Sequence, residues 1–240
     1  MICVDLHNQA IQGFADIPID NLTAIPFFSY YIKNSLIDPY LAEVDEESKK
    51  DKSDFIIISP DAGGTERAKI LANSLGLNLA TMYKYRPEPN VVGTIELLGK
   101  VAGKIAIIVD DMVDTCGTLS KAVAALKEKG ALDVFAFATH APLSGDALTN
   151  ISSSKLTRLF ITNTLDIEDK VAGQDKITVL SVTNLLSIAI LRHSQNKSLS
   201  KIFDLEPAQI DIERFKYCER KKVKEATMTD SVETIVVGEL

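Results

Sequence analysis

Short runs of β-branched and aromatic residues recur along the chain, and they constrain its fold more than any other feature. The clearest runs cover residues 55–59, 105–109, 134–138, 158–162 and 177–181, and weaker ones cover 2–4 and 79–82. Most are continuously apolar, which is typical of strands that are buried on both faces. Between them, apolar residues follow helical spacing over 119–126, with Gly130 placed to end that helix, and again over 185–190. These alternating patterns predict an α/β fold, with a parallel sheet covered by helices on both faces.

Three other segments interrupt this alternation. Residues 41–54 are densely charged and predict a surface loop. Residues 84–100 hold two prolines and two glycines between strands, which predicts a long excursion of the kind that often serves an active site. Residues 204–240 mix charges with few large apolar groups, and we expect a peripheral tail with one helix near 210–226.

Composition excludes several classes of function. The formal net charge of −7 argues against a nucleic-acid partner, which usually requires a basic face. The three cysteines form no Cys-x-x-Cys pair, so neither a disulfide framework nor a zinc site is indicated. No apolar stretch reaches the length of a membrane span, and the first residues do not resemble a signal peptide. We therefore expect a cytoplasmic protein with no membrane partner.

The segment of residues 109–118 carries the strongest chemical signal. Asp110 and Asp111 follow an apolar strand, and two adjacent carboxylates can accept hydrogen bonds from neighbouring sugar hydroxyls. Thr115, Gly117 and Thr118 then open a helix, whose first N–H groups suit a phosphate dianion. The alternative interpretation is an acidic pair beside an ordinary helix cap. The two halves together favour a site for ribose 5-phosphate.

This segment resembles the signature shared by type I phosphoribosyltransferases and ribose-phosphate pyrophosphokinases, also called phosphoribosyl-pyrophosphate synthetases. The form Asp-Asp-Met-Val-Asp-Thr-Cys-Gly-Thr resembles the synthetases specifically. Further segments resemble synthetase motifs, at residues 5–7, 12–14, 17–22, 59–64, 84–90, 139–140 with 144–145, and 162–164. The resemblance covers about residues 2–203. It implies a remnant of the N-terminal synthetase domain at 1–22, a phosphoribosyltransferase-like C-terminal domain at 23–195, and a peripheral tail at 196–240.

The resemblance also implies a function. Synthetases transfer pyrophosphate from ATP to ribose 5-phosphate with Mg²⁺, and they assemble as oligomers. The residues that bind adenine in longer family members have no counterpart here, so we expect a chain with weak or no activity alone. A homo-oligomer, or a hetero-oligomer with full-length subunits, is expected. One alternative is a non-catalytic regulatory subunit of the synthetase-associated kind. Another is a phosphoribosyltransferase, which does not account for the matches at 5–7 and 84–90.

The family motifs imply roles for individual residues. The ribose 5-phosphate group comprises Asp110, Asp111, Asp114, Thr115, Cys116, Gly117 and Thr118. The pyrophosphate and ATP group comprises His7, Asp61, Gly63 and Gly64. The magnesium candidates are Asp5, His7, Asp16, Asp20 and Asp61. The catalytic cations are Lys84 and Arg86, which would be aimed at the transferring group.

Several of these residues have simpler interpretations. Asp61 with its two glycines can form an ordinary turn, and His7 can be a merely hydrogen-bonded histidine. Arg67 is either a phosphate contact or a solvated helix residue. We interpret Cys116 as a small loop residue rather than a nucleophile, and His140 as a residue that orders a strand end.

Other features concern the borders of the site. Tyr85 and Glu88 stand where family members often carry basic residues, so the loop is less positive. Ser198, Ser200 and Phe203 resemble a regulatory phosphate or ADP segment, although a polar loop is the alternative. Without the rest of an N-terminal domain, the strand near residues 2–5 should leave an exposed edge and exposed apolar surface.

Overall fold

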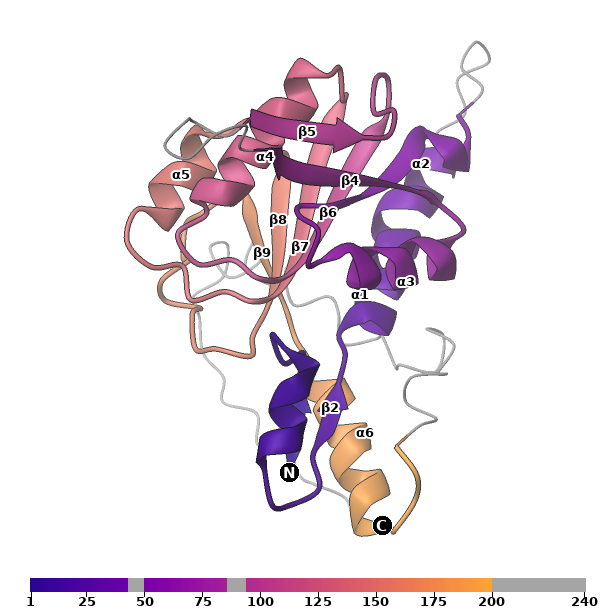
Figure 1. The fold of residues 1–240 in the computed structure, drawn as a ribbon, viewed down its shortest axis with the longest axis vertical. Coiled ribbons are helices and arrows are strands. Elements are labelled where there is room, and N and C mark those ends of the chain that lie inside the picture. The colour runs from indigo at the N-terminus through magenta and orange to yellow at the C-terminus, as the bar shows by residue number, and fades with distance from the viewer. Residues whose placement is uncertain (43–49, 86–93, 200–240) are drawn as a thin grey trace, which may run out of the picture. The chain divides into compact units, whose positions relative to one another are not determined.

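A seven-stranded sheet forms the centre of the described chain (Figure 1). The computed structural model describes residues 1–42, 50–85 and 94–199. The strand order is β5-β4-β3-β6-β7-β8-β9. These strands are β3 (Phe55–Ser59), β4 (Asn78–Tyr85), β5 (Thr94–Leu98), β6 (Ile105–Met112), β7 (Asp133–His140), β8 (Arg158–Thr162) and β9 (Ile177–Leu180). All neighbouring pairs are parallel except β4 and β5, so the predicted parallel sheet is confirmed.

Helices α4 (Gly117–Glu128) and α5 (Ala147–Ser153) cover one face of the sheet. The buried stripe of α4 is Leu119, Ala122, Val123 and Leu126, as the helical spacing predicts. This stripe shares one apolar cluster with Ile56 and Ile58 of β3 and with several residues of β6 and β7. Gly130, with a φ of +87°, follows the end of α4 and confirms the predicted glycine there.

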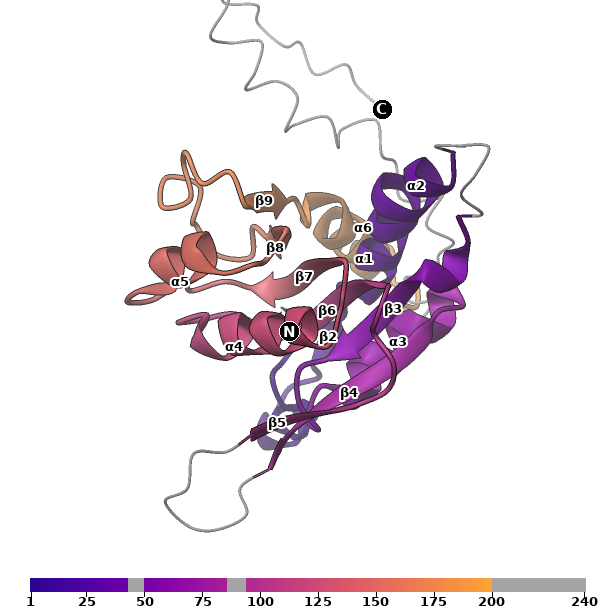
Figure 2. The same cartoon turned by 90° about the horizontal axis from the view of Figure 1, so that it is seen from above.

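The opposite face is covered by α1 (Ile25–Ile32) and α3 (Thr65–Leu75). A π-helical turn (Lys33–Ile37) and α2 (Asp38–Ala42) continue α1. Aromatic rings hold α1 to the sheet: Phe28 lies 5.4 Å from Phe137 between ring centroids, and Tyr31 lies 5.0 Å from Phe160. Because α1 and α4 lie on opposite sides of the strands (Figure 2), the sheet is enclosed by helices on both faces.

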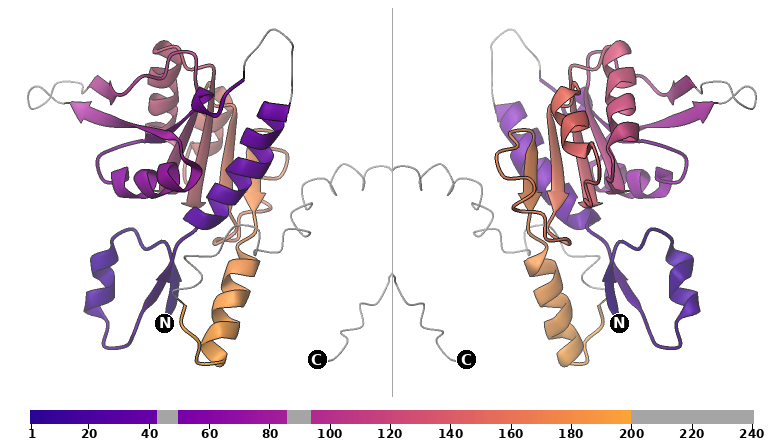
Figure 3. Two further views of the ribbon diagram at one scale, coloured as in Figure 1. Left: turned by 90° about the vertical axis from the view of Figure 1, so that its right-hand side faces the viewer. Right: turned by 90° about the vertical axis from the view of Figure 1, so that its left-hand side faces the viewer.

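A second apolar cluster joins the N-terminal segment to the last described helix. Strands β1 (Ile2–Val4) and β2 (Asp20–Leu22) form a two-stranded parallel sheet, with a 3-10 helix (Gln9–Phe14) between them. Leu22 is buried with Leu185 and Ala189 of α6 (Thr183–Ser194), and the two segments lie side by side (Figure 3). Apolar side chains of this segment are exposed as predicted, most of all Phe14 at 89%.

The structure differs from the sequence-based expectation between residues 84 and 100. Strand β4 continues to Tyr85, and β5 returns antiparallel to it, with Lys84 opposite Ile95. Part of the expected excursion is therefore a strand pair, because Ile95 and Leu97 alternate with polar residues and pack against the core.

Several other expectations concern residues 41–54 and 204–240 and possible membrane helices. In the predicted charged loop, Asp51 caps a 3-10 helix (Lys52–Asp54). Residues 43–49, the tail 204–240 and its expected helix lie outside the described residues. Among the residues described, no helix is long and apolar enough to cross a membrane.

Candidate active site

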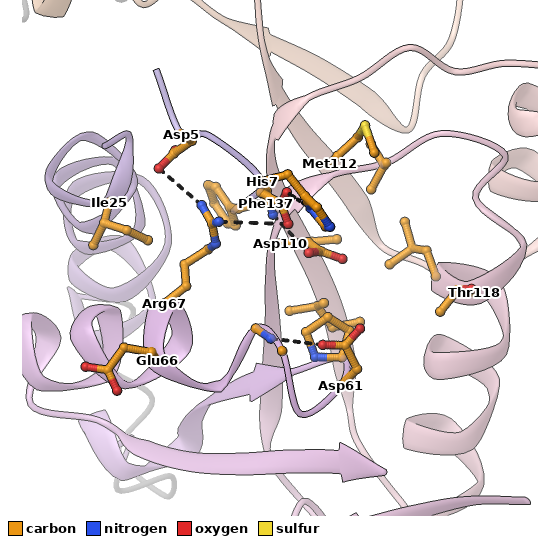
Figure 4. Close-up of a pocket in the computed structure, with 18 of the residues that line it drawn as sticks. Asp5, His7, Ile25, Asp61, Glu66, Arg67, Asp110, Met112, Thr118 and Phe137 are labelled. Carbon is orange, nitrogen blue, oxygen red and sulfur yellow. Dashed lines mark hydrogen bonds and ion pairs between the residues drawn. The ribbon is translucent and has the colours of Figure 1, made fainter. Parts of the chain in front are cut away.

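A pocket of about 1140 Å³ opens at the carboxyl ends of β3 and β6 (Figure 4). In a parallel sheet, this edge is where ligands bind. Most of the predicted site residues line it, from three separate segments of the chain: Asp5, His7, Asp61, Gly63, Gly64, Asp110, Asp111, Asp114, Thr115, Cys116 and Thr118. The fold therefore brings the residues predicted to bind ribose 5-phosphate and those predicted to bind pyrophosphate to one place.

The loop before α4 has an open helix N-terminus. Cys116 occupies the N-cap position in the left-handed conformation, with a φ of +57°, and no side chain caps the helix. At Gly117, an added Cβ would meet only Thr115 Oγ1, at 3.8 Å. The first N–H groups of a helix have no partners within the helix, so this loop suits an anion that approaches the backbone.

Residues that follow β7 hold the same loop from behind. The backbone N–H of Ser144 donates to Asp114 Oδ1 over 3.2 Å, and Asn150 Nδ2 donates to the carbonyl of Thr115 over 2.9 Å. Asn150 lies on α5 and was not among the residues singled out from the sequence. Nothing local marks it, because its role depends on how α5 packs beside α4.

Cys116 is buried within this loop. Burial, together with the charge of Asp114, raises the pKa of its thiol to about 11. The group is therefore a thiol at neutral pH rather than a reactive thiolate. This supports its interpretation as a small loop residue.

The paired carboxylates at the end of β6 are unequal. Burial raises the pKa of Asp110 to about 7, with the hydrogen bond and charge of Asp111 acting in the same direction. For Asp111, burial alone would raise the pKa. Hydrogen bonds with His7 and Asp110 and the charge of Arg67 outweigh this effect and lower it. One carboxylate is thus ionised at neutral pH, while its neighbour titrates close to neutrality.

The turn after β3 combines a cap with accessible backbone. Asp61 Oδ1 accepts a hydrogen bond from Gly64 N over 2.9 Å, and Ser59 Oγ donates to the Asp61 carbonyl over 2.6 Å. The ordinary turn considered above is therefore present. The same turn lines the pocket, and an added Cβ on Gly64 would lie 3.2 Å from Ser59 Oγ, so the glycine permits the close packing. Its structural role leaves the predicted pyrophosphate role open.

His7 reaches the ribose side of the pocket. Its Nδ1 lies 2.6 Å from Asp111 Oδ2, while 77% of its side chain is exposed. The hydrogen bond with Asp111 raises the pKa of His7, and the Asp111 charge adds to the effect. His7 is thus hydrogen-bonded, and its partner is a predicted sugar-binding carboxylate.

Asp5 serves as a buried brace. Its Oδ2 accepts hydrogen bonds from Thr139 Oγ1 over 2.6 Å and from Ala24 N over 3.0 Å. His140 Nε2 contacts the carbonyls of Val4 and Asp5 at 2.9 and 3.2 Å, and its Nδ1 contacts Thr164 Oγ1 at 2.9 Å. The expectation that His140 orders a strand end is confirmed. These contacts tie the N-terminal segment to β7.

Arg67 lines the pocket, and its exposure decides against one of its two interpretations. Its side chain is 17% exposed, so it is not a solvated helix residue. Its Nη1 lies 3.2 Å from Asp5 Oδ1, and its Nη2 lies 3.8 Å from Asp111 Oδ1. The arginine faces two carboxylates in the pocket, and a contact with phosphate stays a prediction.

Of the five magnesium candidates, Asp5, His7 and Asp61 line the pocket. Asp16 is exposed, Asp20 pairs with Ile2 in the small sheet, and neither lines the pocket. Asp5 is occupied by its structural hydrogen bonds. Among residues 1–42, 50–85 and 94–199, no three His, Cys, Asp or Glu side chains are placed to hold a metal ion.

Several predicted residues fall at or beyond the described ranges. The backbone of Lys84 lies in β4, and Arg86 lies outside the described residues, as do Glu88, Ser200 and Phe203. The carbonyl of Ser198 accepts a hydrogen bond from Arg192 Nε over 2.8 Å.

Comparison with known proteins identifies the family. A family model described as "Phosphoribosyl synthetase-associated domain" matches residues 86–204. Ribose-phosphate pyrophosphokinase 3 of Saccharomyces cerevisiae is 44% identical over 207 residues, which is 86% of this chain and 60% of that protein. The ribose-phosphate pyrophosphokinase of Bacillus caldolyticus is 42% identical over 204 residues, covering 85% of this chain and 60% of that protein.

Over these residues the chain is a member of the ribose-phosphate pyrophosphokinase family. The crystal structure of phosphoribosylpyrophosphate synthetase from Mycobacterium smegmatis agrees, with a TM-score of 0.68 and 36% identity. That match covers 81% of this chain and 58% of the other. The chain spans about 60% of the length of the curated pyrophosphokinases that it matches.

Proposed function

We propose that the pocket binds ribose 5-phosphate, for transfer of pyrophosphate from ATP to the sugar. The observation that carries this proposal is the open N-terminus of α4 beside the Asp110–Asp111 pair in one pocket. A sugar phosphate has an anionic end and a diol end. The helix N-terminus complements the anionic end, and the carboxylate pair complements the diol.

Each segment of the pocket has a part in the proposed reaction. The backbone of residues 114–118 holds the 5-phosphate, and Asp110 and Asp111 accept hydrogen bonds from the ribose hydroxyls. The turn of Asp61 to Gly64 faces the pyrophosphate. The C1 hydroxyl oxygen attacks the β-phosphorus of ATP, the bond from that phosphorus to the α-phosphate oxygen breaks, AMP leaves, and the hydroxyl proton is lost. Positioning and charge neutralisation supply the catalysis.

The carboxylates of the pocket fit Mg²⁺ as an ion shared with substrate. Mg²⁺ prefers oxygen ligands, and it commonly takes one or two carboxylates together with substrate phosphates. Asp110 is partly buried, and burial and then the charges of Asp111 and Asp61 raise its pKa, so negative charge is poorly compensated there. We propose that substrate phosphates hold the ion together with one carboxylate, from Asp61 or from the Asp110–Asp111 pair, because no three described side chains are placed to hold it alone. The ion would neutralise charge on the transferring group.

Isothermal titration calorimetry with ribose 5-phosphate tests the proposal directly. The unsubstituted chain should bind the sugar phosphate, and Asp111→Asn should weaken binding without unfolding the protein. Asp169→Asn, on an exposed turn, provides the control. Equal affinity of the Asp111→Asn and unsubstituted chains would contradict the assignment.

A non-catalytic partner role is the second candidate. The exposed side chains of Phe14 (89%) and Ile17 (52%) favour assembly with another subunit. We propose a homo-oligomer or a mixed oligomer with full-length synthetase subunits. Size-exclusion chromatography of the chain with and without a full-length synthetase distinguishes these states, and an unchanged elution of both proteins would count against the mixed assembly.

A further inference from the structure

Arg67 connects two carboxylates that come from distant parts of the chain (Figure 4). It projects from the first turn of α3, which follows the Asp61 turn. Its two terminal nitrogens divide between Asp5, at 3.2 Å, and Asp111, at 3.8 Å. The guanidinium thus stands between the N-terminal segment and the end of β6.

The contact with Asp5 is the shorter of the two and the more buried. The Asp5 side chain is 6% exposed, and Arg67 is the cation that the structure places against it. The other oxygen of Asp5 holds Ala24 N and Thr139 Oγ1. A buried carboxylate requires a compensating charge as well as hydrogen bonds. Arg67 therefore stabilises the brace that fixes residues 4–8 beside the pocket.

The contact with Asp111 is longer than a hydrogen bond and acts through charge. The second oxygen of Asp111 is held by His7, so the carboxylate lies between a cation and an imidazole. Arg67 Nε is buried and makes no hydrogen bond with the described residues. An unpaired buried donor is unfavourable, so hydrogen bonding of Nε does not hold Arg67 in this position. The attraction of the two carboxylates determines where the side chain lies.

We propose that Arg67 is a positioning residue of the site. It couples the Asp5 brace to the Asp111 carboxylate, and so fixes Asp111 and His7 in one arrangement for the ribose hydroxyls. This role rests on the proposed binding of ribose 5-phosphate. Arg67 acts on the sugar through Asp111 and not by direct contact.

Two measurements on the same variants test this role. Arg67→Gln removes the charge, and Arg67→Lys keeps the charge but loses the planar fork. Lys69→Gln removes a charge from an exposed position of the same helix, as the matched control. Amide hydrogen exchange over residues 1–24 reports the brace in the free protein, and calorimetry with ribose 5-phosphate reports the site.

We expect Arg67→Gln to accelerate exchange over residues 1–24 and to weaken ribose 5-phosphate binding by about tenfold or more, as loss of a supporting partner does elsewhere. Arg67→Lys should recover part of both properties, and Lys69→Gln should change neither. Weaker binding with unchanged exchange would mean that Arg67 contacts the sugar phosphate itself, and it would overturn the positioning role. Faster exchange with unchanged affinity would also overturn it, because the brace would then be uncoupled from the site.

Failure of the proposed function can be distinguished from failure of the role of Arg67. If the unsubstituted chain does not bind ribose 5-phosphate, both the function and the coupling to substrate are overturned. If it binds and Arg67→Gln matches it in both measurements, only the role of Arg67 is lost. Should Arg67→Gln not fold, the double variant Asp5→Asn with Arg67→Gln removes the uncompensated buried charge, and it should show the same faster exchange and weaker binding. Normal exchange and affinity in that variant would contradict the proposal.

Discussion

Nδ1 of His7 lies 2.6 Å from Oδ2 of Asp111, although 104 positions separate the two residues in the chain. The contact places an imidazole from the N-terminal segment on a carboxylate at the end of β6. The pKa of His7 is raised in the folded protein, so the interaction is fully present below the ordinary histidine value of 6.5. It is lost as the pH rises through the folded value.

The His7 contact predicts a pH-dependent effect of His7→Gln. Below pH 6 the variant should unfold at a slightly lower temperature, by at most about 2 °C because the imidazole is largely exposed. At pH 8.5 the two proteins should unfold together. Thermal unfolding followed by circular dichroism checks this, with His193→Gln on α6 as the control. An equal loss at both pH values would show that the charged pair is not responsible.

Asp110 predicts a loss of stability in the same direction, as the pH rises, but from an acidic group that is neutral at low pH. Its pKa is raised to about 7, first by burial and then by Asp111, so the folded state binds this proton more tightly than the unfolded state does. The stabilising contribution of the protonated form is therefore present at pH 4 and is lost as the pH rises to 7 and above. Asp110→Asn should remove this decline and stabilise the protein at pH 8 by on the order of 2 kcal/mol. Urea unfolding at pH 5 and pH 8 measures the difference. An equal change in the free energy of unfolding between pH 5 and pH 8 in the unsubstituted protein and in Asp110→Asn would show that Asp110 does not cause the decline.

Gly117→Ala separates ligand binding from folding. Within the protein an added Cβ meets only Thr115 Oγ1 at 3.8 Å, so stability should change by less than about 0.5 kcal/mol. The methyl group would nevertheless stand where the 5-phosphate approaches the backbone, and we expect calorimetry to show affinity for ribose 5-phosphate reduced by about tenfold or more. Gly130→Ala is the matched control: its φ of +87° predicts lost stability with unchanged affinity. Unchanged binding by Gly117→Ala would place the phosphate elsewhere.

The isolated chain should bind ribose 5-phosphate but turn over very slowly. The residues predicted to contact ATP lie on its pyrophosphate side, and contacts to phosphate alone are screened by salt and orient a nucleotide poorly. Misplacement of the reacting groups by about 1 Å can cost on the order of 10² in rate. Steady-state release of AMP across a range of ATP concentrations measures this. Saturable turnover at the rate of ordinary kinases would show that the chain holds a complete ATP site.

Lys84 and Arg86 are predicted to act on the transferring group. In an assembly of this chain with an active full-length synthetase, alanine at either position should lower the kcat of the sites that this chain completes by about 10²-fold. Lys100→Ala provides a control from the same part of the chain. A change confined to KM would mean that the two cations only hold substrate.

The loop that we propose for ribose 5-phosphate could be located from sequence because its geometry is local. Strand β6, the acidic pair and the start of α4 are consecutive, so spacing alone places them together. Strand β5 could not be recognised in the same way, since Ile95 and Leu97 follow a segment rich in proline and glycine that favours a loop. These residues form a strand because Ile95 and Leu97 pack against the core, a contact that the sequence does not reveal.

The network around Arg67 was beyond sequence reasoning for a different reason. The partners of Arg67 lie 62 positions before it and 44 positions after it, and neither spacing has a local signature. The acidic residues near the N-terminus show the same limit. Asp5 turns inward while Asp16 remains exposed, and only the tertiary fold distinguishes them.

The hydrogen bond from Thr139 to Asp5 has a consequence for synthesis of the chain. The two residues are 134 positions apart, so the brace cannot form until Thr139 has left the ribosome. Contacts of such long sequence separation require a large loss of chain entropy before they form, and they tend to form late. During translation, the first 24 residues must wait for β7. Until then their apolar side chains are available to chaperones.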